Sequence, residues 1–105
     1  GNLEETVYEY LGPVIEYDKQ NNGELMPTLK TYLACNGSKQ ETSKQLFIVR
    51  QTLYHRLEKL EKLLRSDFMR SDKRLGLEFM IFALDFLQYS SRKISGKYVD
   101  KYIGR

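Results

Sequence analysis

With 105 residues and a formal net charge of +3, the chain is long enough for one domain of ordinary size and too short for two. Its single cysteine, Cys35, excludes an intrachain disulfide framework and fits a reducing compartment. The longest apolar run, residues 79–84, is far below the roughly 20 residues of a membrane-spanning helix, and the acidic N-terminus carries no apolar signal segment. We therefore expect a cytoplasmic protein without membrane association.

Apolar residues recur with helical spacing along nearly the whole chain, and no segment alternates with the period of two that is typical of a strand. This pattern predicts an all-α domain of about five to six helices. In the first third of the chain, glycine, proline and asparagine separate three predicted helices, over residues 3–11, 13–19 and 24–35. The predicted breaks are Gly12-Pro13, Asn21-Asn22-Gly23 and Asn36-Gly37.

The middle of the chain has the organisation of a helix-turn-helix, between about Ser38 and Leu64. Ser38-Lys39-Gln40-Glu41 forms an S-x-x-E capping box that opens a short helix ending near Leu46. Residues 47–49 are too few for anything but a turn, and a longer helix is predicted over residues 50–64. Its buried stripe consists of Leu53, Leu57, Leu60 and Leu64.

The last major helix is predicted from Ser71, which with Asp72 would cap it, to about Tyr89. Because it is apolar on nearly every side, it must be covered from more than one direction. It is either the central helix of the domain, which we favour, or a helix whose outer face packs on a second copy. In the basic tail, residues 91–105, apolar spacing indicates one more short amphipathic helix.

The charge is unevenly distributed. Residues 1–37 hold six acids and two bases, whereas residues 38–65 hold seven bases and three acids, and residues 66–105 hold eight bases and five acids. A polyanion would meet the positive charge of the middle and the tail. An ordinary solvated surface explains the charge equally well, so charge alone does not decide the function.

The face of the 50–64 helix opposite its leucines carries the groups that reach base edges or phosphates. At about 100° per residue, the side chains that point away from the leucines are Gln51, His55, Lys59 and Lys62. Thr52 and Arg56 lie on one flank, and Arg50 and Tyr54 lie on the other. We predict a DNA-binding site formed by Lys39, Arg50, Gln51, Thr52, Tyr54, His55, Arg56 and Lys59.

Four segments, in this order along the chain, resemble one known family. Residues 11–18 read L-G-P-V-I-E-Y-D, residues 24–33 read E-L-M-P-T-L-K-T-Y-L, residues 46–57 read L-F-I-V-R-Q-T-L-Y-H-R-L, and residues 72–75 read D-K-R-L. They are similar to L-G-P-L-L-E-Y-D, E-L-L-x-T-L-R-x-Y-L, L-F-V-H-R-N-T-L-R-Y-R-L and E-D-R-L of the PucR/CdaR-type transcriptional regulators.

The resemblance implies the C-terminal DNA-binding module of a larger bacterial regulator, whose effector is sensed by upstream domains absent from this chain. Arg50, Thr52 and Arg56 match the family residues, and Gln51 replaces asparagine conservatively. Three positions depart from the family pattern: Val49 replaces histidine, and Tyr54 and His55 replace arginine and tyrosine. These departures put the operator sequence in doubt, but not the fold.

Two other readings compete with DNA binding. An enzyme is not expected, because the chain has one histidine and one cysteine, no glycine-rich phosphate loop and no clustered metal ligands. No metal or cofactor is expected either. The stronger alternative is a helical protein-interaction or dimerisation module without DNA binding, with the aromatic-rich helix of residues 75–89 as its contact surface. The partner we expect is double-stranded DNA, bound by a single chain or by a homodimer.

Overall fold

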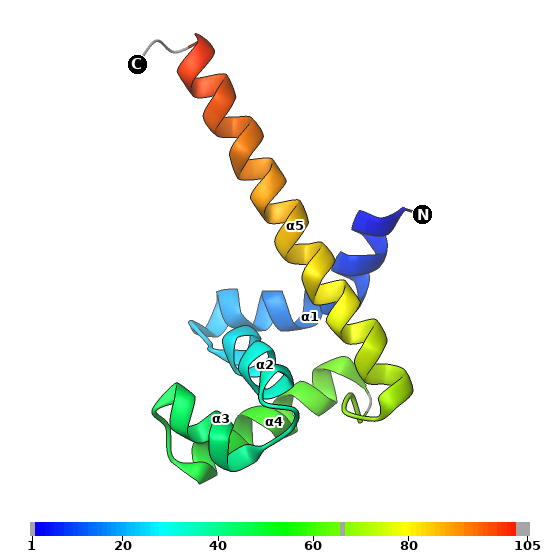
Figure 1. The fold of residues 1–105 in the computed structure, drawn as a ribbon, viewed down its shortest axis with the longest axis vertical. Helices are drawn as coiled ribbons and strands as arrows, with labels where there is room; N and C mark the ends of the chain where they lie inside the picture. Colours follow the sequence, from blue (N-terminus) through cyan, green and yellow to red (C-terminus); the bar gives the residue numbers. More distant parts are fainter. Residues whose placement is uncertain (1, 66, 103–105) are drawn as a thin grey trace.

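The computed structural model describes residues 2–65 and 67–102, with side chains for residues 2–65 and 67–92. The described residues form five helices and no strand, which confirms the predicted all-α fold (Figure 1). The helices are α1 (Leu3–Asn21), α2 (Leu25–Ala34), α3 (Lys39–Leu46), α4 (Arg50–Leu64) and α5 (Ser71–Tyr102).

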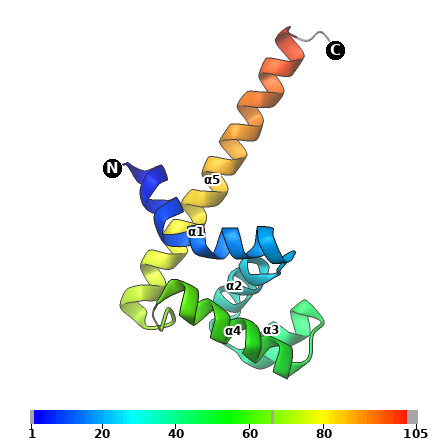
Figure 2. The ribbon, with the colours of Figure 1, turned by 180° about the vertical axis from the view of Figure 1, so that it is seen from behind.

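Helix α1 is a single helix, so the prediction of two helices separated at Gly12-Pro13 was wrong. Pro13 lies inside α1, and the helix changes direction part-way along (Figures 1 and 2). A proline removes one backbone donor and crowds the preceding turn, which bends a helix without having to end it. Val7, Leu11 and Val14 are fully buried on both sides of the proline, and this packing carries the helix across it.

The core is built around α4, which packs against α1, α2 and α3, while α5 packs against α1. Most of the completely buried side chains are aliphatic: Val7, Leu11, Val14, Leu29, Leu53, Leu60 and Leu77. Helix α3 contributes Thr42, which is fully buried, and its hydroxyl is satisfied there because it donates to the Ser38 carbonyl at 2.6 Å. The positions of α3 and α4 are therefore fixed by the same core that joins the other helices.

Two charged side chains join different helices. Asp18, near the end of α1, accepts hydrogen bonds from the backbone N–H groups of Leu25 (2.9 Å) and Met26 (2.8 Å) and so caps α2. Arg74, in the first turn of α5, donates to the Leu33 carbonyl (3.1 Å) and to Asn36 Oδ1 (2.7 Å). Both ends of α2 are thus held by other helices.

The capping box at the start of α3 is half formed. Ser38 Oγ accepts from the Glu41 N–H at 3.1 Å, as predicted. The second bond of a capping box would run from the Ser38 N–H to the Glu41 carboxylate. Instead, the Ser38 N–H donates to the Cys35 carbonyl, and Glu41 Oε1 accepts from Gln45. The preceding break at Asn36-Gly37 is confirmed, since both residues adopt positive φ.

Helix α5 differs most from the prediction. It continues to Tyr102 as one helix of 32 residues. The prediction of a separate helix in the tail was therefore wrong for the residues up to Tyr102, and residues 103–105 lie outside the described part. Its far half projects from the other helices, and the radius of gyration of 16.0 Å exceeds the roughly 13 Å of a compact chain of this length (Figure 1). Helix α5 is also not a central helix, because only one side of it is buried.

Candidate nucleic-acid interface

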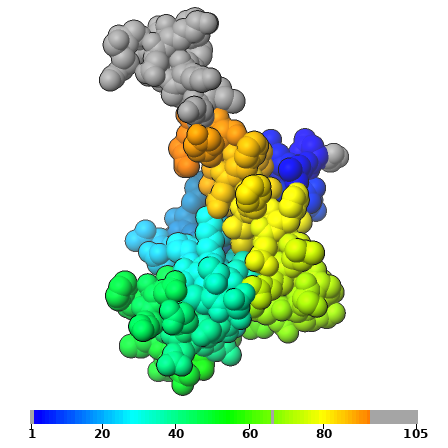
Figure 3. Space-filling model, in the orientation of Figure 1, coloured from blue at the N-terminus to red at the C-terminus, as the bar shows by residue number. Residues whose placement is uncertain are grey.

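Helices α3 and α4 lie at one end of the molecule (Figure 3), and Figure 1 shows the projecting part of α5 at the opposite end. The three-residue turn between them is closed by two backbone hydrogen bonds, from Phe47 N–H to the Lys44 carbonyl (3.2 Å) and from Ile48 N–H to the Ser43 carbonyl (3.1 Å). Ile48 packs against the core and thereby fixes the position of the turn. The short helix, the turn and the longer helix have the bounds that the sequence predicted.

Helix α4 buries its leucines, as predicted: Leu53 and Leu60 are fully inaccessible, and Leu57 and Leu64 are nearly so. The side chains on its opposite face are exposed, among them Gln51 and His55. Thr52, Arg56 and Lys59 are half-buried on the flank that faces α1 and α2. The predicted site residues therefore divide into an exposed outer ridge, formed by Gln51 and His55, and two flanks.

On the flank that faces α3, two cations lie near the Tyr54 ring. The Lys39 ammonium lies 5.3 Å from the centre of the Tyr54 ring, and the Arg50 guanidinium carbon lies 6.0 Å from it. Attraction between a cation and the ring face is worth about 0.5–1 kcal/mol at an exposed site. The Tyr54 ring thus has two cations within cation–π range, one from the start of α3 and one from the start of α4.

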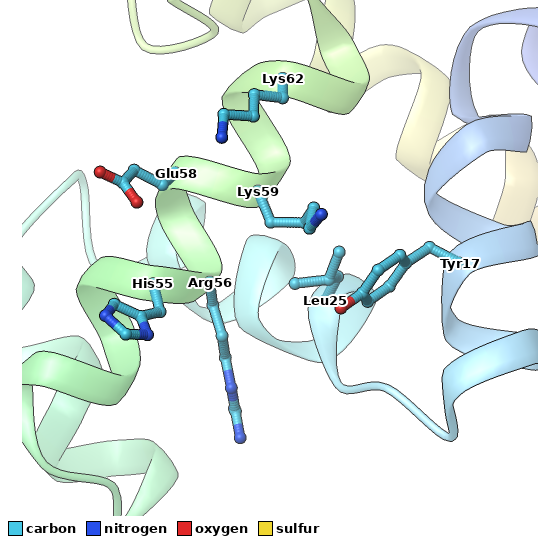
Figure 4. A pocket seen from close by; sticks show the side chains of 7 residues that line it. All are labelled: Tyr17, Leu25, His55, Arg56, Glu58, Lys59 and Lys62. Atoms are coloured by element: carbon cyan, nitrogen blue, oxygen red, sulfur yellow. The ribbon is translucent and has the colours of Figure 1, made fainter.

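On the other flank, α4 borders a groove of about 330 Å³ that reaches α1 and α2 (Figure 4). Arg56 donates from Nη1 to Thr28 Oγ1 at 3.1 Å, and Thr28 in turn donates to the Glu24 carbonyl at 2.6 Å. The Lys59 ammonium lies 5.2 Å from the centre of the Tyr17 ring. Arg56 and Lys59 are therefore held at the groove and do not stand on the outer ridge with Gln51 and His55.

Acidic residues are absent from the first two turns of α4 and begin at Glu58 and Glu61. The N-terminal end of the helix also carries the positive end of the helix dipole. Val49, the residue before α4, provides no side-chain hydrogen bond to the first turn. Positive charge and backbone donors are therefore concentrated at the start of α4.

Two exposed apolar residues in the turn were not among the predicted site residues. Phe47 is 94% exposed and Val49 is 69% exposed. Phe47 also has the left-handed conformation, with φ of 56° and ψ of 43°, which is uncommon for a bulky side chain. The sequence identified these residues as a turn, but only the packing of Ile48 inward shows that its two neighbours face solvent.

The described residues hold no group of three or more histidine, cysteine, aspartate or glutamate side chains that could bind a metal ion. Within the same part of the chain, no helix is both long and apolar enough to cross a membrane.

Comparison with known proteins assigns the helix-turn-helix to a family. The family model of the PucR C-terminal helix-turn-helix domain matches residues 25–83, which is more than half of the chain and runs from α2 to the middle of α5. The searches of curated proteins and of solved structures gave no match. The matched region contains the α3–turn–α4 unit and every predicted site residue. The chain therefore belongs to the family of PucR C-terminal helix-turn-helix domains, a family of DNA-binding and not of catalytic domains.

Proposed function

We propose that this chain is the sequence-specific DNA-binding domain of a bacterial transcriptional regulator of the PucR/CdaR type, and that α4 enters the major groove with its N-terminal end first. One observation carries the proposal. The outer face of the first two turns of α4 is exposed at one end of the molecule, has polar and basic side chains and lacks acids. In helix-turn-helix proteins this part of the second helix contacts base edges.

Base reading is assigned to the outer ridge and its nearest neighbours. Gln51 can pair with adenine through its amide, and Arg50 can pair with guanine or with a phosphate. Gln51 and His55 are four residues apart, about 6 Å along the helix axis, which spans roughly two base-pair steps. Thr52, half-buried on the groove side, can contact a thymine methyl group with its own methyl group.

Phosphate contacts are assigned to the cations on the two flanks. Lys39 and Arg50 each lie within cation–π range of the Tyr54 ring on the flank that faces α3, and we assign both to the DNA strand on that side. On the opposite flank, Lys59 can meet the other strand. The N–H groups at the start of α4 suit a phosphate as well, because the helix dipole favours an anion there.

Glu58 and Glu61 limit how far α4 can enter the groove. Both carboxylates belong to the later turns, and Glu58 is exposed beside the outer ridge. A helix lying along the groove over its full length would bring these carboxylates close to phosphates, which costs free energy. We therefore propose that α4 is tilted, so that only residues 50–56 approach the bases.

Phe47 and Val49 extend the proposed interface by an apolar contact. They flank the inward-facing Ile48 at the entry to α4, and both are largely exposed. Apolar side chains at this place can pack on a sugar or on a thymine methyl group. In the whole regulator, we propose that the effector acts on domains upstream of this chain and that the protein works in the cytoplasm, where the DNA is.

The experiment is a selection of bound sequences from random duplexes, followed by titration of the selected site with variants. We expect Gln51→Ala to weaken binding about 5- to 150-fold and to relax the preference at one base pair, as the loss of a bidentate base contact does. Lys73→Ala is the matched control, since Lys73 is exposed in the first turn of α5, outside the proposed interface.

Arg50→Ala separates base reading from phosphate contact in the same assay. A loss of preference at one position assigns Arg50 to a base, and a uniform loss over all sequences assigns it to a phosphate. Failure to enrich any sequence, or equal affinities of the wild type and of both α4 variants, would overturn the proposed function.

A further inference from the structure

Helix α5 carries five large apolar side chains that the rest of the chain leaves exposed. We call them the α5 stripe: Leu75 (74% exposed), Phe79 (56%), Phe82 (70%), Phe86 (60%) and Tyr89 (57%). The opposite side of the helix, with Leu77, Ile81 and Leu84, is buried in the core. Helix α5 thus has two apolar faces, and only one of them is covered.

The spacing of the α5 stripe is that of a helix–helix seam. Its members follow one another at intervals of four, three, four and three residues, an average of 3.5. A repeat of 3.5 keeps apolar side chains on one line of an α-helix and is the spacing at which two helices pack side by side. In heptad terms Phe79 and Phe86 occupy the a positions, and Leu75, Phe82 and Tyr89 occupy the d positions.

The area of the stripe is sufficient for a dimer. The exposed fractions together equal about three fully exposed large side chains, or roughly 600 Å² at about 200 Å² each. Two copies would bury about 1,200 Å², which is the lower bound of specific, stable interfaces. A patch of this size is at the upper end of what monomeric proteins expose, and such patches are often functional.

The charges beside the stripe favour an antiparallel pair. Glu78, Asp85 and Arg92 flank it at the g positions, and all three are exposed. When two copies of α5 run antiparallel with Phe82 beside the partner's Phe86, Glu78 lies opposite the partner's Arg92. An antiparallel register shifted by one heptad would oppose Glu78 to the partner's Asp85. A parallel pair would oppose Glu78 and Asp85 to uncharged residues, Ala83 and Ser90, and Arg92 to the like charge of Lys97.

We propose that the α5 stripe binds the α5 stripe of a second copy of this chain, antiparallel, around a two-fold axis close to residue 84. In this register Phe79 lies beside the partner's Tyr89, so aromatic rings meet in every central layer. Asp85 comes near the partner's Asp85, but Lys30 neutralises it through an ion pair of 2.8 Å within each chain. The inference does not depend on DNA binding, because no residue of the α5 stripe is among the residues proposed to contact DNA.

Sedimentation equilibrium of the 105-residue chain without DNA tests the interface. We expect a dimer at micromolar concentration, and we expect Phe82→Glu to raise its Kd by about 100-fold or more, because a charge would be buried at the centre of the seam. Phe82 is 70% exposed, so the variant should keep its fold, which circular dichroism verifies. Leu3→Glu is the control, since Leu3 is 50% exposed on α1.

A monomeric wild type at the highest attainable concentration would overturn the proposal. A wild-type dimer with the same Kd as Phe82→Glu would also overturn it, because the contact would then lie elsewhere.

A charge swap tests the antiparallel register. Arg92→Glu and Glu78→Arg should each weaken the dimer several-fold, because each places like charges opposite one another, and the double variant should recover the wild-type Kd. Arg92→Glu is the cleaner single change, because Glu78 also pairs with Arg74 within α5 at 3.1 Å. Unchanged Kd values in both single variants would overturn the antiparallel register.

Discussion

Phe47 combines a backbone conformation that disfavours large side chains with a side chain that faces water. The left-handed region costs an ordinary residue about 1–2 kcal/mol relative to the right-handed helix. Burial does not offset this cost, because Phe47 is 94% exposed. The turn needs this conformation to reverse the chain between α3 and α4, and glycine would adopt it without strain. A phenylalanine at this position is therefore understandable as a contact residue, which is the role we propose for it.

Phe47→Gly should separate stability from DNA binding. Relief of the left-handed strain offsets the roughly 0.4–1 kcal/mol of extra chain entropy that glycine brings to the unfolded state. We expect urea unfolding within about 1 kcal/mol of the wild type and a weaker complex with the selected duplex. Phe47→Ala, which keeps a Cβ atom but loses the ring, should weaken the complex equally. Wild-type affinity in both variants would remove Phe47 from the interface.

Tyr32 gives the protein a dependence on alkaline pH. Its pKa is raised above the usual 10.0, first by burial and then by the negative charges of Glu61 and Asp67. The unfolded chain therefore loses this proton at a lower pH than the folded chain. The stability due to the neutral phenol is complete below about pH 10 and declines as the pH rises above it.

Tyr32→Phe should remove that part of the pH dependence. The ring, which packs edge-on against Phe68 with 6.2 Å between the centres, would be retained. Urea unfolding measured between about pH 9 and 11 should show a steeper loss of stability in the wild type than in the variant. Parallel curves would mean that Tyr32 ionises at the same pH in both states.

At the scale of elements, α2 is positioned by side chains from α1 and α5. The residue before α2, Glu24, forms no side-chain cap, and Asp18 takes over this role from seven and eight residues upstream. An acid at a helix start also interacts favourably with the helix dipole. Because Thr28 of α2 in turn holds Arg56 of α4, this cap contributes to the placement of the proposed DNA-binding helix.

Asp18→Ala should destabilise the fold by about 1–2 kcal/mol, the usual cost of losing an N-cap acceptor. Asp18→Asn keeps one acceptor oxygen and should cost less. Equilibrium urea unfolding measures both. Glu16→Ala is the control, because Glu16 is exposed on the same helix and accepts a hydrogen bond only from Gln20 within α1 among the bonds described. Equal stability of Asp18→Ala and Glu16→Ala would show that the cap is replaced by water.

At the scale of the whole molecule, the proposed DNA-binding end and the α5 stripe lie in different places, so both surfaces can be occupied at once. Two copies related by a two-fold axis would present two α4 helices, and the selected sequence should then be an inverted repeat. The affinity for such an inverted repeat depends on both the DNA-binding end and the α5 stripe. The affinity for a single half-site depends on the DNA-binding end alone.

Salt dependence should distinguish binding to the full inverted repeat from binding to a single half-site. If one copy neutralises about four phosphates, affinity for a half-site falls about tenfold for each doubling of the salt concentration. On the full inverted repeat the slope should double for the wild type and stay near the half-site value for Phe82→Glu. Fluorescence anisotropy at several salt concentrations measures it. A half-site affinity that is insensitive to salt would contradict phosphate binding.

The sequence by itself determined the elements that local physics controls. The leucine period, the capping serine and the length of the turn gave the bounds of α3 and α4, because each depends on neighbouring residues. The same period gave the buried and exposed faces of α4. Pro13 was misjudged, because whether a proline ends or bends a helix depends on packing on both sides of it, which the local sequence does not contain.

Tertiary structure alone decided what each remaining face of the helices meets. The half-burial of Arg56 and Lys59, the cap that Asp18 provides and the exposure of Phe47 depend on how the helices pack against one another. Helix α5 shows the reason most clearly. Its apolar residues predicted that several sides of the helix must be covered. They did not indicate which side the other helices of this chain would cover. Only the packing against α1 showed which side this chain covers itself and which side stays exposed.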